Sequence, residues 1–162
     1  MIRGPSDIAA MFSVMHDGGI AAWSGDFAGL RLRVEIEYLA RRISSAFRYF
    51  EIELVHVRDL RFSTWPNDEA APPRVVSDPD RIFHAELEIL SAEVHGTGVR
   101  VICNQPSPNL DYCGGEMDFT VDCAVVRDEH QNVWSVSELS ALADAYWSEW
   151  QRKSEENQRN AT

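Results

Sequence analysis

The chain has 162 residues, of which 44% are hydrophobic and 25% are charged, as in ordinary globular proteins. Its formal net charge of −11 makes nucleic acids and anionic membrane surfaces poor partners, because both are bound through clustered Lys and Arg. We expect one domain over residues 1–155 and a frayed tail over residues 156–162, where no large apolar side chain anchors the chain.

The N-terminal third predicts a lead-in, a turn and a strand. Residues 1–10 are expected to be loose or helical, and an apolar run follows from Met11 to Met15. His16-Asp17-Gly18-Gly19 then has the composition of a tight hairpin turn before a short strand. Residues 30–38 alternate between apolar and charged side chains, which predicts a strand with one dry face and one wet face.

The middle of the chain alternates between further strands and irregular loops. A short helical connection is expected over residues 39–48, and proline-rich or glycine-rich surface loops over 66–79 and 105–115. Strands are expected at residues 50–57, 60–65, 82–95, 99–103 and 116–126.

A C-terminal helix is indicated by Ser135 and Glu138, whose spacing matches a capping box. Apolar side chains including Leu139, Tyr146 and Trp150 then share one helical face. The chain is therefore predicted to be an α+β protein, with a mainly antiparallel sheet of about six to eight strands and this amphipathic helix packed on it.

Glutamates occupy the wet face of three predicted strands: Glu35 and Glu37, Glu51 and Glu53, and Glu86 and Glu88. Like charges on neighbouring strands need compensation, which can come from Arg side chains in an ordinary cross-strand ladder. A surface for a basic protein is the second interpretation, with Trp65 as an added aromatic anchor. A metal site is the least favoured, because strand carboxylates without an Asp/Asn-rich loop make a poor calcium cage.

Candidates for chemistry are His56, His84 and Cys113 as reactive or cleft residues. A nucleophilic Cys needs a base within reach, and none of the histidines has motif spacing to Cys113. His16 and Asp17 are adjacent, so their side chains are expected to point apart. Because no catalytic motif is present, no catalytic residue, metal or cofactor is expected and an enzyme is disfavoured.

The cysteines at 103, 113 and 123 are odd in number and include no CxxC pair, which favours reduced thiols and a cytoplasmic location. The N-terminal apolar stretch fits neither a secretory signal nor a membrane span, because Asp7 and Asp17 bound it.

Residues 12–20, FSVMHDGGI, followed by the alternating strand from Leu30, resemble the opening of small bacterial β-rich domains, over about 30 of the 162 residues. Some of those domains resemble immunity proteins of polymorphic toxin systems. The resemblance implies a cytoplasmic protein that binds one cognate protein and catalyses nothing.

Our leading hypothesis is thus a non-enzymatic module that binds a basic protein. A small-molecule binder or enzyme with a site in a sheet cleft is the alternative. A structural subunit or homodimer is the third.

Overall fold

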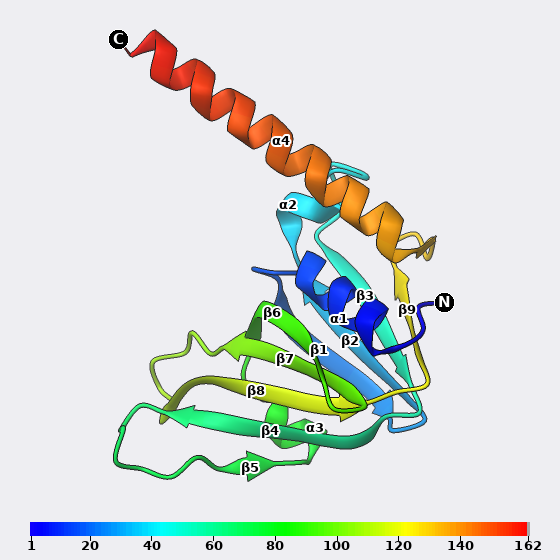
Figure 1. Ribbon diagram of the computed structural model, residues 1–162, viewed down its shortest axis with the longest axis vertical. Helices are drawn as coiled ribbons and strands as arrows, with labels where there is room; N and C mark the ends of the chain where they lie inside the picture. The colour runs from blue at the N-terminus through cyan, green and yellow to red at the C-terminus, as the bar shows by residue number, and fades with distance from the viewer. Residues whose placement is uncertain (162) are drawn as a thin grey trace.

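The structure is a computed structural model that describes residues 1–161, which form one large antiparallel sheet and four helices (Figure 1). The α+β class is confirmed, but the described residues form ten strands, so the predicted six to eight is too low. The strands are β1 (Gly19–Asp26), β2 (Gly29–Glu35), β3 (Tyr49–Val55), β4 (Arg58–Pro66), β5 (Val75–Val76), β6 (Leu87–His95), β7 (Gly98–Asn104), β8 (Tyr112–Thr120), β9 (Cys123–Arg127) and β10 (Val133–Trp134). The helices are α1 (Pro5–Val14), α2 (Glu37–Ala40), α3 (Pro79–Ile82) and α4 (Val136–Asn160).

The sheet has two halves that meet at a short junction. Its strand order is β10-β9-β3-β2-β1-β6-β7-β8-β4-β5. At the centre of this order, β1 and β6 pair only at Gly19 with Glu88 and at Ile20 with Leu87. The pairings on either side of it, β1 with β2 and β6 with β7, are longer, so the two halves are joined by a short ladder.

Helix α1 covers the apolar face beside this junction. The expected lead-in and the apolar run from Met11 form this single helix, which packs on β6 and β7. Phe12 contacts Phe119 edge to face, with ring centroids 5.8 Å apart, and both side chains are buried. Gly18 and Gly19 therefore lead from a helix into β1, and the predicted hairpin turn at this position is wrong.

Strand β2 shows the alternation that its sequence predicts. Leu30, Leu32 and Val34 are buried, whereas Arg31 and Arg33 are exposed. The strand ends at Glu35, however, and Glu37 begins helix α2. Tyr38 is therefore helical, not the last residue of the strand, and it packs beside α4.

Helix α4 begins with the expected capping box, in which Ser135 and Glu138 satisfy each other's backbone N–H groups. It contacts α1 and α2 rather than lying mainly on the strands, which corrects the expected packing on the sheet. Its C-terminal half extends away from the body of the molecule (Figure 1). The helix continues to Asn160 through most of the expected tail, and Thr162 lies outside the described residues. Within residues 1–161, no helix is both long and apolar enough to cross a membrane.

Candidate functional site

The junction between the two halves of the sheet gathers carboxylates on its polar face. Gly19 lies in the middle of a three-strand row, directly opposite Glu35 on β2 and Glu88 on β6. Neighbouring strands are about 4.8 Å apart, so the two glutamates project from positions about 10 Å apart with a glycine between them. The sheet register therefore brings together two like charges that are distant in the sequence.

Glu86 extends over this glycine. A Cβ atom added to Gly19 would lie 2.1 Å from Oε1 of Glu86, so the missing side chain leaves the space that this carboxylate occupies. Asp17 is fixed beside it by backbone hydrogen bonding, because its N–H donates to the carbonyl of Ile89 at 2.8 Å. Asp17, Glu35, Glu37, Glu86 and Glu88, here called the acidic cluster, line a shallow hollow of about 350 Å³ together with Arg48.

Most of the acidic cluster has no cationic partner. Within the described residues, the side chains of Glu35, Glu86 and Glu88 make no hydrogen bond or ion pair. Glu37 pairs with Arg41 and with Arg48, the latter at 3.2 Å. The carboxylate of Asp17 has, within residues 1–161, only one contact with a basic side chain, at 3.9 Å from Nε2 of His16. The hollow therefore keeps a local negative charge that the fold does not neutralise.

An aromatic cluster adjoins the acidic cluster at Asp17. It consists of His16, Tyr38, Tyr146, Trp147 and Trp150. The His16 ring stacks on Trp147, with centroids 5.6 Å apart and an interplanar angle of 17°. Tyr38 lies 4.6 Å from Tyr146 and 5.6 Å from Trp147 between ring centroids. Trp147 and Trp150 remain 37% and 56% exposed, so large apolar rings face solvent beside the carboxylates.

Tyr38 joins the two clusters. Its hydroxyl donates a 3.1 Å hydrogen bond to the carbonyl of His16, the residue before Asp17. Burial, followed by the nearby charge of Asp17, raises the pKa of Tyr38 to about 12. The phenol therefore stays neutral and remains a donor at physiological pH, which fixes the turn that carries Asp17.

The same polar face carries a second set of charges with a different organisation. Glu53 lies opposite Arg31, and Glu51 lies opposite both Arg33 and Arg127. Nη1 of Arg127 donates to Glu53 at 2.8 Å, and Arg31 approaches Glu53 at 3.6 Å. The hydrogen bond from Arg127 holds the pKa of Glu53 below its usual value despite partial burial. These residues form a cross-strand ladder of the kind that is the first interpretation of the glutamates from sequence, and we call them the charge ladder.

The glutamates predicted as one surface are therefore divided between two arrangements. Glu51 and Glu53 belong to the charge ladder, whereas Glu35, Glu37, Glu86 and Glu88 belong to the acidic cluster. From sequence, Asp17 is expected only in a turn, and no pattern connects His16 or Tyr38 with Trp147. Those associations depend on the packing of α1 and α2 against α4, for which the local sequence has no signal.

The remaining predicted residues lie elsewhere. Trp65 is half-buried on β4, separated from β1 in the sheet by β6, β7 and β8, and packs against Gly114. Cys113 is exposed, and its thiol donates to the carbonyl of Trp65 at 3.6 Å. Within the described residues no histidine is hydrogen-bonded to this thiol, so no nucleophile–base pair is formed there.

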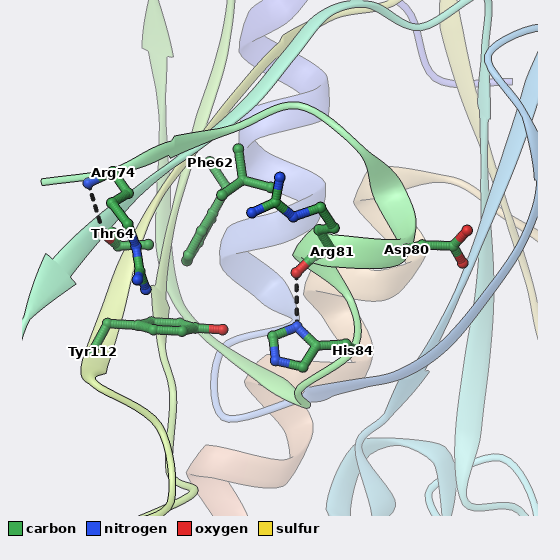
Figure 2. A pocket seen from close by; sticks show the side chains of 8 residues that line it. Phe62, Thr64, Arg74, Asp80, Arg81, His84 and Tyr112 are labelled. Atoms are coloured by element: carbon green, nitrogen blue, oxygen red, sulfur yellow. Dashed lines mark hydrogen bonds between the residues drawn. The ribbon is translucent and has the colours of Figure 1, made fainter.

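The two candidate histidines occupy different settings. His56 lies in the exposed turn between β3 and β4, with Nδ1 2.6 Å from Asp122. Hydrogen bonds from His56 and from Arg58 lower the pKa of Asp122. His84 instead lines a separate pocket next to α3, together with Tyr112 and Arg81 (Figure 2). Of these two histidines, His84 therefore lines a cleft beside the sheet.

No group of three or more His, Cys, Asp or Glu side chains within residues 1–161 is arranged to hold a metal ion. The acidic cluster thus lacks the convergent geometry of a cation cage. No protein-family model, curated protein or solved structure matches this chain. The function must therefore be inferred from the geometry of the chain itself.

Proposed function

We propose that this chain is a non-enzymatic, immunity-like protein-binding module that recognises a basic protein through the acidic cluster and the adjoining aromatic cluster. The observation that carries this proposal is their contiguity: exposed Trp147 stacks on His16, the residue before Asp17 of the acidic cluster, and exposed Trp150 lies 6.1 Å beyond Trp147 between ring centroids. Charge of one sign speeds and orients the encounter with a partner of the opposite sign. Buried aromatic anchors supply much of the affinity at protein interfaces.

The energetics of the acidic cluster favour binding over a structural role. Like charges placed on neighbouring strands destabilise a sheet by a few tenths to about 1 kcal/mol per pair. The fold compensates such charges at Glu53 but leaves Glu35, Glu86 and Glu88 without partners within the described residues. Sites that break a local stability rule in this way are often functional sites.

The partner chemistry follows from these side chains. Lys or Arg side chains of the partner would enter the hollow beside Gly19 and pair with the glutamates. A further cationic group could lie against the face of Trp147 or Trp150, where cation–π attraction is strongest for Trp. Arg41, Arg42 and Lys153 border the aromatic cluster, but they are already paired with Glu37 or Glu149. They therefore leave the negative charge at Asp17 and the glutamates dominant.

The test is capture of partners from native cell lysate at about 50 mM and about 500 mM salt, which changes the screening length roughly threefold. The bait is wild type beside a cluster variant, Glu35→Gln with Glu88→Gln. The matched control is a ladder variant, Glu51→Gln with Glu53→Gln, which makes the same charge change on the same face. Circular dichroism would establish that each variant is folded before capture.

We expect wild type and the ladder variant to capture the same basic protein at low salt, and the cluster variant to lose it. Trp150→Ala should weaken the purified complex by about tenfold or more, as truncation of an interface anchor does. Capture of the same proteins by the cluster and ladder variants would overturn the proposal. Self-association of wild type through this surface would instead support the homodimer hypothesis.

A further inference from the structure

A second pocket lies in the outer half of the sheet, away from the junction. Its walls come from β4, the segment from β5 to α3 and the start of β8, and its volume is about 360 Å³ (Figure 2). Phe62, Val76 and the ring of Tyr112 make the apolar part of the lining. Phe62 and Tyr112 meet edge to face, with centroids 6.2 Å apart, so the apolar wall is fixed in place. The size falls within the range of small-ligand sites.

The hydroxyl of Tyr112 is a hydrogen-bonding group of the pocket. The residue as a whole is only 6% exposed, and its hydroxyl makes no hydrogen bond within the described residues. Figure 2 shows the hydroxyl pointing across the pocket toward His84. The hydroxyl oxygen is not itself buried but faces the open space of the pocket, where it is available to donate a hydrogen bond to a ligand.

His84 is held with one nitrogen available. Its Nδ1 lies 2.7 Å from the carbonyl oxygen of Arg81, and since a carbonyl can only accept, Nδ1 must carry the proton. The imidazole is therefore fixed in orientation, and Nε2 remains free to interact with a ligand or a bound water. Thr64 also has an available proton, because its Oγ1 accepts the backbone N–H of Arg74 at 3.0 Å.

Arg81 supplies a cation that the protein leaves unpaired. Its guanidinium makes no ion pair within residues 1–161, and Figure 2 shows it over the pocket near Phe62. Arg74, by contrast, is neutralised by two hydrogen bonds to Asp111, at 3.0 and 2.7 Å. The carboxylate of Asp80 points away from Tyr112 and Arg74 in Figure 2. The pocket thus has an available positive charge in a protein of net charge −11.

We propose that this pocket binds a small organic monocarboxylate with a flat apolar body. The carboxylate would accept paired hydrogen bonds from Arg81, whose planar guanidinium matches that geometry. The Tyr112 hydroxyl donates a further hydrogen bond, and the flat body packs on Phe62 and Val76. This inference is independent of the proposed protein partner, because the two sites share no residue.

The test is an NMR titration of backbone amides with benzoate as the probe and benzamide as its neutral analogue of similar shape. Indole-3-acetate provides a second acid with a larger flat body, and inorganic phosphate tests for unspecific anion binding. We expect saturable shifts confined to residues 62–64, 74–76, 80–84 and 112, with a Kd of about 1 mM or tighter for at least one acid. Benzamide should bind at least about tenfold more weakly, because it has no negative charge and has only one acceptor oxygen for the Arg81 guanidinium.

Three variants separate the parts of the site. Arg81→Gln should weaken binding by about tenfold, since it removes the charged donor pair. Tyr112→Phe removes only one oxygen and should weaken binding by about threefold to tenfold. Arg152→Gln is the matched control on the exposed part of α4 and should leave the affinity unchanged.

Absence of saturable shifts with both acids would overturn the proposal. Equal binding of benzamide or phosphate, or an equal effect of Arg152→Gln, would also overturn it.

Discussion

The charge ladder and the acidic cluster lie on the same face of one sheet, but they are organised in opposite ways. In the charge ladder, Glu53 contacts Arg31 and Arg127 on the two flanking strands. In the acidic cluster, the position between Glu35 and Glu88 is Gly19, and Glu86 fills the space above it. One region alternates charges across strands, whereas the other places like charges around a glycine.

This difference indicates that the charge ladder stabilises the fold and that the acidic cluster has another function. Alternating charges on neighbouring strands stabilise their pairing, while like charges oppose it. The charge ladder can be explained entirely by the needs of the fold. The acidic cluster cannot, because it lies at a two-residue pairing between the halves of the sheet and increases the repulsion there. We therefore assign the ladder to folding and the cluster to partner binding.

The largest expected change in the free energy of unfolding is at an ion pair in the other half of the sheet, between Arg100 and Asp118. Arg100 makes hydrogen bonds to both carboxylate oxygens of Asp118, at 2.7 and 2.9 Å, and Asp118 is buried. Asp118→Ala should lower the free energy of unfolding by about 2 kcal/mol, because it leaves a partly buried guanidinium with a weaker partner. Urea unfolding measures this. Arg61→Gln, a more exposed and more distant partner of Asp118, is the control and should cost less than about 0.5 kcal/mol.

Breaking the charge ladder should have an intermediate effect. Arg127→Gln removes the 2.8 Å hydrogen bond to Glu53 and leaves the longer contact with Arg31. We expect the free energy of unfolding to fall by about 1 kcal/mol, measured by urea unfolding at low salt. An unchanged or increased stability would show that the ladder does not support the fold.

Acid should weaken the ladder through the same carboxylate. The hydrogen bond from Arg127 lowers the pKa of Glu53 in the folded protein. A lowered folded-state pKa contributes stability that is complete above the unfolded-state pKa and is lost as the pH falls through the folded value. The free energy of unfolding should therefore decrease between about pH 5 and pH 2, and Arg127→Gln should make that decrease shallower. An identical pH dependence in the two proteins would contradict this assignment.

The smallest expected effect on stability is at the centre of the acidic cluster. Gly19→Ala places a Cβ atom where the Glu86 carboxylate lies, but that carboxylate is the end of a flexible side chain and can move outward. We expect the free energy of unfolding to change by less than about 0.5 kcal/mol. Capture of the basic partner at low salt should nevertheless weaken, because the cluster is spread apart. The double variant with Glu86→Ala is the control, since it removes the displaced group.

The local elements could be predicted from sequence because each has its own signal. Alternation from Leu30 to Glu35 identifies β2, and Ser135 with Glu138 identifies the start of α4. Two-residue strands such as β5 and β10 are too short to show a period. The expected strand over 116–126 also spans the break between β8 and β9, and together these explain the low strand count. The run from Met11 to Met15 is too short to show a helical period by itself, so its place in α1 has no clear local signal.

The candidate site could be predicted only in part. Its glutamates were identified correctly as residues of a polar sheet face, but which of them meet is decided by strand order. Gly19 brings Glu35 and Glu88 together only because β1 lies between β2 and β6. No local pattern encodes that placement, since β2 and β6 are separated in the sequence by loops and by three intervening strands.

The central claim is tested most directly by urea unfolding of the cluster and ladder variants, at about 50 mM and about 500 mM salt. Both variants remove two negative charges from the same face. The account predicts opposite signs: Glu35→Gln with Glu88→Gln should stabilise the protein at low salt, by a few tenths to about 1 kcal/mol, and less at high salt. Glu51→Gln with Glu53→Gln should destabilise it. Destabilisation by both variants would contradict the account, because the acidic cluster would then also serve the fold.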